Sequence, residues 1–390
     1  MYQPIKLLQA LTFTGCLMYA ITPVAQPKIS VSTGASQVAA VVSAVRDQRV
    51  GLFVNQTATV GKTHLVDTLL SCGVRVVKIY SPEHGFRGDA DAGEDVGNGV
   101  DPRSGVPIVS LYGPNKKPKP DQLADVDVIL FDMQDIGVRF FTYISSLHYM
   151  MEACAEQKKK LIILDRPNPN GGYVDGPVME TAHKSFVGMH PVPVVHGMTI
   201  GEYARMVNGE GWLPNGLRCD LQVIAVKGWK HGDPWSVPVK PSPNLPNDHA
   251  IRIYPSTCFF EGTVLSIGRG TLNPFEQAGH PDLKGYAHTF TPVSIPGMSK
   301  TPPFQNQVCH GLDFRNMSVT DQLNLAPLIE LYNAFPDKDK FFISYFEKLA
   351  GTATLREQIR QGMSAQKIRE SWQPGLKAFR EIRKKYLLYP

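Results

Sequence analysis

The stretch from residue 74 to residue 88 constrains the fold of this chain more than any other part of its sequence. It begins with an apolar, β-branched run, which is typical of a short strand buried on both faces. The run stops at Pro82, and a carboxylate and an imidazole, Glu83 and His84, follow directly. Because open α/β sheets bind ligands at the carboxyl ends of their strands, Glu83 is our first candidate for a catalytic residue.

Comparable runs alternate with helical segments up to about residue 230. Further strands are predicted at residues 49–55, 107–112, 127–131, 161–164 and 221–226, with helices at 37–46, 64–72, 120–123, 142–158 and 201–209. This alternation predicts a parallel, doubly wound α/β sheet. The first strand is not followed by a GxGxxG motif, so we expect no dinucleotide cofactor.

Polar side chains stand at the ends of four of the predicted strands. They are Asn55, Glu83, Asp132 with Asp135, and Asp165 with Arg166. A single aspartate after a strand is usually a helix cap or a turn residue. Parallel strands, however, bring all four ends to one edge of the sheet, and together they favour a site at that edge.

The sequence changes character after about residue 230. Residues 234–255 are rich in proline, which predicts a rigid, extended connection. Short, turn-rich strands are expected at 281–303, and helices at 321–335, 340–349, 354–361 and 364–386. We therefore expect an α/β domain at residues 26–230, followed by a smaller α+β domain at residues 231–390.

The first 25 residues have the features of a secretory signal peptide. Lys6 precedes an apolar stretch that ends in small residues near Ala25. We therefore expect residues 1–25 to be removed and the protein to be periplasmic or extracellular; the alternative is a buried N-terminal helix. Residues 13–16 also resemble a bacterial lipobox, with Phe13 in the usual place of leucine, so Cys16 is a candidate for lipidation.

The composition excludes some classes of protein. A hydrophobic content of 43% and a charged content of 19% are those of a globular chain. The net charge of +5 is small for 390 residues and no nucleic-acid-binding motif is present, so we expect no nucleic acid partner. The cysteines after Cys16 are widely spaced and fit no zinc motif, so we expect mostly small buried residues and leave any disulfide pairing open.

Seven short blocks of this sequence resemble one known family. They are SPEHGFRG at 81–88, FDMQDIGVRFFTY at 131–143, DRPNP at 165–169, HGMT at 196–199, PSPN at 241–244, FEGT at 260–263 and GRGT at 268–271. In this order they resemble the bacterial exo-β-N-acetylmuramidases, glycoside hydrolase family 171, formerly a family of unknown function. The resemblance runs from about residue 50 to the C-terminus. It implies a Rossmann-like domain, a smaller second domain and a site in the cleft between them.

The resemblance also implies an activity. Members of this family remove terminal N-acetylmuramic acid from the non-reducing end of peptidoglycan fragments, and no nucleotide or metal cofactor is implied. We therefore expect an exo-acting glycoside hydrolase that uses muramyl saccharides in cell-wall turnover. Two other classes remain open. One is a non-catalytic cell-wall sugar-binding protein; the other is a metal-dependent esterase or deacetylase using His84, His196 and the strand-end aspartates, although no HExxH motif is present.

Two carboxylates are candidates for the chemistry. Glycoside hydrolysis commonly needs an acid that protonates the leaving oxygen and a second group that acts as base or nucleophile. Glu83 suits the first role because it follows a rigid strand end, and Glu261 is the candidate for the second because an apolar run precedes it. Asp132 and Asp135 are alternatives for the second role, and Glu261 could instead be a buried partner of Arg269.

The remaining candidates would bind the sugar. Tyr143 is suited to stacking on the ring, and Asn168 and Asn244 to hydrogen bonds with hydroxyl or acetamido groups. The lactyl carboxylate of muramic acid calls for a cation, for which Arg139 and Arg269 are candidates, although Arg139 could equally hold Asp135 in place. The predicted set is completed by His84, Asp132, Asp135, His196 and Glu276. Of these, His196 is either a proton carrier or an ordinary loop histidine.

Overall fold

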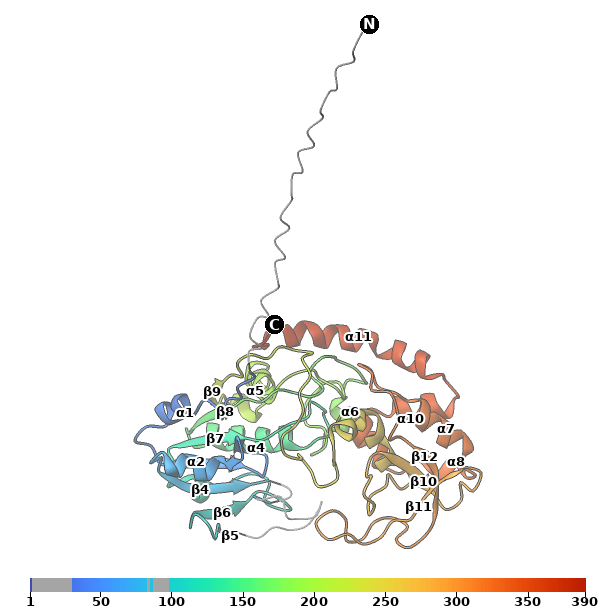
Figure 1. Ribbon diagram of the computed structural model, residues 1–390, viewed down its shortest axis with the longest axis horizontal. Coiled ribbons are helices and arrows are strands. Elements are labelled where there is room, and N and C mark those ends of the chain that lie inside the picture. Colours follow the sequence, from blue (N-terminus) through green and yellow to red (C-terminus); the bar gives the residue numbers. More distant parts are fainter. Residues whose placement is uncertain (2–29, 83–84, 87–97) are drawn as a thin grey trace. The chain divides into compact units, whose positions relative to one another are not determined.

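The computed structural model describes residue 1 and residues 30–82, 85–86 and 98–390. Val31–Pro390 forms one compact unit, which Figure 1 shows with its elements labelled. Apart from Met1, the expected signal peptide and Cys16 lie outside the described residues, and so do Glu83 and His84. The predictions on those residues therefore stay predictions, as does the domain boundary near residue 230.

A seven-stranded sheet forms the core of the first half of the chain. Its order is β5 (Gly99–Val100), β6 (Pro107–Ser110), β4 (Val76–Ser81), β1 (Val50–Val54), β7 (Val128–Asp132), β8 (Lys160–Leu164) and β9 (Asp220–Ile224). All neighbouring strands are parallel except β5, which runs antiparallel to β6. From β6 to β9 this is the strand order of a Rossmann sheet, with the switch point between β1 and β7. The predicted doubly wound α/β fold is confirmed.

Successive residues of the central strands point into two different apolar layers, as the pleat of a strand requires. On one face, Phe53, Ile129 and Leu161 pack with helices α4 (Tyr143–Glu156) and α5 (Ile200–Gly209). On the other face, Leu52, Leu130 and Ile162 pack with α1 (Val38–Ala44) and α2 (Leu65–Ser71). Because both faces are covered, the strands are apolar throughout rather than alternating, which explains why they were recognisable in the sequence.

The second half of the chain has an antiparallel sheet and short helices. The sheet has the order β10 (Gln277–His280), β12 (Cys309–Asp313) and β11 (His288–Phe290). The helices are α6 (Asp248–Thr257), α7 (Ala326–Ala334), α8 (Lys338–Phe341), α9 (Phe346–Ala350), α10 (Thr354–Arg360) and α11 (Ala365–Lys384). Smaller elements of the first half are the β2 (Thr59–Val60) and β3 (Thr63–His64) hairpin and the short α3 (Pro120–Leu123). The expected α+β character of this second half is confirmed.

Two predictions for this half were wrong. The extended connection expected at 234–255 gives way to helix α6, although Pro255 lies inside it. Asn247 caps the helix by accepting a hydrogen bond from the Ala250 N–H, 2.8 Å away. Pro255 cannot donate to the carbonyl of Ile251, and the Asn170 side-chain amide donates to that oxygen instead, at 3.3 Å.

The helix expected at 340–349 is split into α8 and α9. Phe342 between them is extended and pairs with Thr263 as an antiparallel bridge. The flanking bonds run from Val264 N to the Phe341 carbonyl, at 2.9 Å, and from Ile343 N to the Gly262 carbonyl, at 3.0 Å. Pairing with a distant segment therefore overrides a local helical preference.

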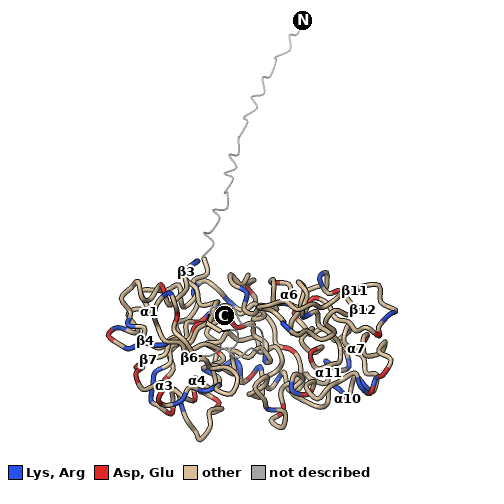
Figure 2. The backbone as a smooth tube through the Cα atoms, turned by 90° about the horizontal axis from the view of Figure 1, so that it is seen from below, with Lys and Arg blue, Asp and Glu red and all other residues tan. Residues whose placement is uncertain are grey.

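Helix α11 and the residues behind it return to the first half of the molecule. The helix buries Ile368, Trp372, Leu376 and Phe379 along one stripe, as its amphipathic pattern predicts. After the helix, the Tyr389 hydroxyl donates to the Asp165 carboxylate at 2.5 Å, just beyond β8. Charges of both signs are interspersed along the described chain (Figure 2).

Four of the five described cysteines are buried, as expected, whereas Cys72 is exposed. All five are free thiols, and burial raises the pKa of Cys154 and Cys258. Among the described residues, no helix combines the length and apolar character that crossing a bilayer requires.

Candidate active site

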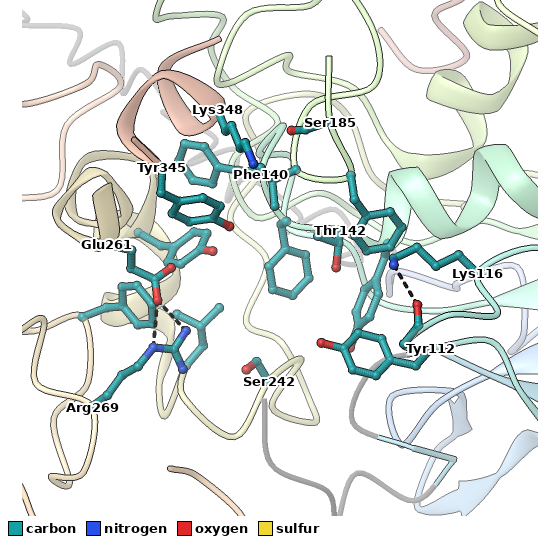
Figure 3. Close-up of a pocket in the computed structure, with 18 residues that line it drawn as sticks. Tyr112, Lys116, Phe140, Thr142, Ser185, Ser242, Glu261, Arg269, Tyr345 and Lys348 are labelled. Atoms are coloured by element: carbon teal, nitrogen blue, oxygen red, sulfur yellow. Dashed lines mark hydrogen bonds and ion pairs between the residues drawn. The ribbon is translucent and has the colours of Figure 1, made fainter. Parts of the chain in front are cut away.

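A pocket of about 530 Å³ lies beside the ends of β6 and β7 (Figure 3). This volume is typical of small-molecule sites. Residues from both halves of the chain line it: Tyr112, Gly113, Lys116, Phe140–Tyr143, Ser185–Val187, Ser242, Leu245, Tyr254, Glu261, Arg269, Phe275, Tyr345 and Lys348. Segments on either side of residue 230 therefore share one cavity, as the expected interdomain cleft requires.

The loop after β7 delivers four of these residues to the cavity. Its course depends on Gly137, which has a φ of 74°. A side chain there would be strained, and its Cβ would lie 2.1 Å from Nδ2 of Asn168. Asp135 holds the turn by accepting a hydrogen bond from the Gly137 N–H at 2.7 Å. The chain then runs into Phe140–Tyr143 and the start of α4.

Glu261 is the carboxylate of this pocket, at the C-terminal side of α6. Its Oε1 accepts from Nε of Arg269 at 2.8 Å and lies 2.7 Å from Nη2 of the same guanidinium. Its Oε2 lies 3.6 Å from the Cys258 thiol, a weak donor. One carboxylate oxygen is thus held by the arginine, and the other keeps acceptor capacity. This arrangement suits a base, a nucleophile or an acceptor for sugar groups.

The pairing of Glu261 with Arg269 is the alternative that the sequence left open, and it is present. The two side chains are 22% and 24% exposed, so the pair is only half-buried in the pocket wall. Desolvation opposes the charge of Arg269, but the Glu261 carboxylate outweighs it and raises the pKa of the guanidinium. Phe275 supports the arginine from its face, with a distance of 5.1 Å to the ring centroid.

Aromatic rings form much of the remaining wall. Phe141 contacts Tyr143 and Tyr254 edge-to-face, and Tyr254 contacts Phe275 in the same way. The Tyr143 hydroxyl donates to the carbonyl of Pro241 at 2.8 Å, which ties the start of α4 to the proline-rich segment. The predicted stacking residue Tyr143 therefore lines the pocket, with its hydroxyl used as a tether.

Several predicted residues at the strand ends lie outside this pocket and hold loops. Asp132 forms a bidentate ion pair with Arg166, whose Nε and Nη2 donate to the carboxylate at 2.5 and 2.8 Å. Asn168 donates to the Met198 carbonyl at 2.9 Å and is fully used in the loop after β8. Desolvation raises the pKa of Asp135 to about 7, although backbone N–H groups oppose the shift. The strand ends do gather at one edge, but these polar groups mainly stabilise that edge.

Arg139 and His196 are also buried outside the pocket. The Arg139 guanidinium donates to four backbone carbonyls rather than to Asp135, and it is fully buried. His196 accepts a hydrogen bond from the Met198 N–H, and burial lowers its pKa to about 3. The ordinary loop histidine is therefore the interpretation of His196 that this geometry favours, and a lactyl-binding role for Arg139 finds no support in it.

The last two predicted residues belong to the second half of the chain. Asn244 donates to the Met298 carbonyl at 2.9 Å, and its Oδ1 has no partner among the described residues. Glu276 lies 3.0 Å from the ring of His249 and accepts from Asn247 at 3.1 Å. Of the predicted set, the structure therefore brings Tyr143, Glu261 and Arg269 together in the pocket.

The sequence reasoning missed other lining residues. Tyr112 is the last residue of a predicted strand and Lys116 lies in the loop behind it, so the strand-end rule could have found them. Tyr345 and Lys348 lie far along the chain, on and beside the short helix α9, and carry no local signal. Together the described lining residues supply three cations and one carboxylate, which makes the cavity suitable for an anionic ligand.

Fold and pocket define an α/β protein of the Rossmann type with a cavity of small-molecule size, in which the described lining residues carry a net positive charge. Family models for the N-terminal and C-terminal parts of the exo-β-N-acetylmuramidase NamZ match residues 50–249 and 252–389. The chain is 39% identical over 372 residues to the peptidoglycan β-N-acetylmuramidase NamZ of Bacillus subtilis (strain 168), covering 88% of each chain. It therefore belongs to the NamZ exo-β-N-acetylmuramidase family, as its motifs predicted.

Two crystal structures of DUF1343-family proteins from Bacteroides fragilis share this fold. One is 46% identical, with a TM-score of 0.86 over 92% of this chain and 99% of its own. The other is 30% identical, with a TM-score of 0.77 over 93% of this chain and 100% of its own. The Rossmann-like sheet and the antiparallel second half are therefore family features.

Proposed function

We propose that this protein is an exo-acting glycoside hydrolase that releases terminal non-reducing N-acetylmuramic acid from peptidoglycan fragments. Membership in the NamZ family is the basis for the reaction. The observation that carries the proposal here is the cavity itself, where an arginine-held carboxylate faces aromatic rings and two lysines. A carboxylated amino sugar needs all three: a carboxylate for the chemistry, a flat apolar surface and a cation.

We assign the acid role to Glu83 and the second role to Glu261. Arg269 holds one oxygen of Glu261 in place and leaves the other with acceptor capacity, which a base or nucleophile requires. Glu83 follows β4, the neighbour of β6, whose end contributes to the cavity. The acid role of Glu83 rests on its sequence position at the end of a buried strand.

The compartment is part of the same proposal. We propose that residues 1–25 direct export and are removed. If the lipobox is used instead, the chain is cut before Cys16, and Cys16 is kept and lipidated. Intact-mass measurement of the protein from its native host separates these cases. Retention of Met1 through Ala25 contradicts export by a cleaved signal, and a diacylated Cys16 identifies a lipoprotein.

The activity is tested with a chromogenic N-acetylmuramide and the matching N-acetylglucosaminide. We expect turnover of the muramide and at least a tenfold lower kcat/KM for the glucosaminide. A sugar-binding protein without activity would bind the muramide and release no chromophore. Elemental analysis of the purified protein addresses the metal-dependent alternative.

The Glu83→Gln variant then tests the acid. It keeps the side-chain shape and removes the proton donor, so kcat on a poor leaving group should fall by on the order of a hundredfold or more. The loss should be smaller on an activated aryl glycoside, which needs less protonation. Equal losses on both substrates, in a folded variant, would assign Glu83 to another role.

A further inference from the structure

Lys116 lines the pocket, and its ammonium group has no carboxylate partner among the described residues, unlike that of its neighbour Lys117. The Lys117 ammonium is neutralised by Glu152 at 2.7 Å and by Glu156 at 2.9 Å, both on α4. The Lys116 ammonium donates to the carbonyl of Gly113 at 2.7 Å, and no carboxylate of the described chain pairs with it. Within the described part of the chain, one of two adjacent lysines is therefore a cation without a carboxylate partner that lines the cavity.

The position of the Lys116 ammonium is fixed from two sides. On one side is the Gly113 carbonyl; Figure 3 marks this bond. On the other is the ring of Phe186, with its centroid 5.1 Å from the nitrogen. An ammonium held this way still has donors to offer, because a lysine carries three N–H bonds and the carbonyl uses one.

The supports of Lys116 are themselves anchored to α4. The Ser145 hydroxyl donates to the carbonyl of Phe186 at 2.6 Å, and the Tyr149 and Phe186 rings stack with an interplanar angle of 14°. The cation is thus preorganised, so binding an anion costs little conformational entropy.

We infer that Lys116 is the group that binds the lactyl carboxylate of the muramyl residue. This inference rests on the proposed function and deepens it. In Figure 3, Lys116 lies across the cavity from the Glu261–Arg269 pair. The lactyl ether of muramic acid projects from C3, away from the anomeric carbon at which the bond is broken. A sugar with its anomeric centre toward Glu261 therefore directs its carboxylate toward Lys116.

Lys116 is better suited to bind the lactyl carboxylate than the predicted Arg139 or Arg269, because both arginines already have partners. Arg139 is fully buried on carbonyl oxygens, and Arg269 already holds Glu261. Lys348 is the other lysine that lines the pocket, but it is exposed and makes no hydrogen bond or ion pair with the described residues. It adds to the general positive potential, whereas Lys116 is fixed in place.

The test measures binding of N-acetylmuramic acid and of its lactamide, in which the carboxyl is a primary amide. Calorimetry on the whole protein should show the acid bound about 10- to 100-fold more tightly than the amide, because a hydrogen bond between charged groups contributes about 1.5–3 kcal/mol. In Lys116→Gln this preference should fall to within about threefold. The variant Lys116→Arg, which keeps the charge and the aromatic contact, should retain most of it.

Lys117→Gln is the matched control, since it removes the adjacent, already neutralised lysine; it should keep the preference of the wild type. With the chromogenic muramide, Lys116→Gln should raise KM at least tenfold and change kcat by less than about threefold, as expected for uniform binding. A preference that survives in Lys116→Gln, or that is lost in Lys348→Gln instead, overturns the assignment.

The outcome also separates this inference from the proposed function. A wild type that prefers the acid and hydrolyses no muramide refutes the reaction and leaves the carboxylate site. A wild type that hydrolyses muramides and binds acid and amide equally refutes the carboxylate site and leaves the reaction.

Discussion

A structural role and a substrate-binding role of Arg139 predict opposite effects of its substitution on stability and on substrate affinity. Its Nη1 donates to the carbonyls of Pro177 and Val192 at 2.8 and 2.7 Å. Its Nη2 donates to those of Leu349 and Ala350 at 2.8 and 2.7 Å. The side chain therefore joins the segment before α5 to the C-terminal end of α9, and through α9 it positions the Lys348 side of the pocket.

The Arg139→Lys variant keeps the charge and shortens the reach. Desolvation lowers the pKa of Arg139 to about 9, so the guanidinium is still protonated at neutral pH. A lysine can reach two of the four carbonyls, which leaves two buried acceptors without a donor at about 1–3 kcal/mol each. Burying a strongly hydrated ammonium in place of the more weakly hydrated guanidinium adds to this loss. We expect the free energy of unfolding to fall by about 3–5 kcal/mol, a large part of the total for a protein of this kind.

Denaturant unfolding followed by circular dichroism measures this change. Arg315→Lys is the control, because Arg315 makes a surface ion pair with Asp313 and is 50% exposed; that variant should leave the free energy of unfolding nearly unchanged. If Arg139→Lys is as stable as the wild type but loses its affinity for N-acetylmuramic acid, the structural reasoning is refuted. The substrate-binding role predicted for Arg139 would then be correct.

Three further changes test other parts of the structure. Burial raises the pKa of Asp135 to about 7, above its unfolded value, so the protonated carboxyl stabilises the fold at low pH and this contribution is lost as the pH rises through 7. Relative to Asp135→Asn, the wild type should lose up to about 4 kcal/mol of unfolding free energy between pH 4 and pH 8. Equal pH dependence of the unfolding free energy in the two proteins would contradict this. Glu261→Gln should lower kcat by about a hundredfold or more with little change in unfolding midpoint, whereas a change confined to KM would make Glu261 a binding residue. Gly137→Ala should cost about 2–4 kcal/mol in denaturant unfolding, because of its φ of 74° and the contact with Asn168, while Gly285→Ala, which meets no atom within 4 Å, should be neutral.

The sheet was predictable from the sequence because its strands are buried on both faces. Residues 128–131, for example, are apolar at every position and are bounded by Asp127 and Asp132, so local composition identifies the strand. The order of the strands was not predicted, because right-handed crossovers fix the hand of each connection and leave more than one strand order open. The errors fall where distant partners decide the local structure: Asn170 compensates for Pro255 in α6, and the bridge between Thr263 and Phe342 divides a predicted helix.

The candidate site was predictable only in part. Motif blocks pointed to Tyr143, Glu261 and Arg269, which the structure brings together. Polar residues at strand ends can serve either of two needs in this fold. The first is to bind a ligand, and the second is to cap helices and form ion pairs in the loops at that edge. Asp132 meets the second need through Arg166, and nothing local distinguishes it from a residue that faces a ligand. Whether Lys348 lines the pocket depends on where helix α9 packs in the fold, and no short window of sequence determines that position.

The contact between Tyr389 and Asp165 has a consequence for how this protein is made. Synthesis runs from the N-terminus, and early parts of a chain fold while later parts are still absent. Here the loop after β8 receives its partner from Tyr389, and the Pro390 carbonyl accepts from the N–H of His231 at 3.1 Å. The Rossmann-like half therefore cannot complete its packing before residues 389 and 390 have been synthesised. An affinity tag fused behind Pro390 would be attached directly beside this contact.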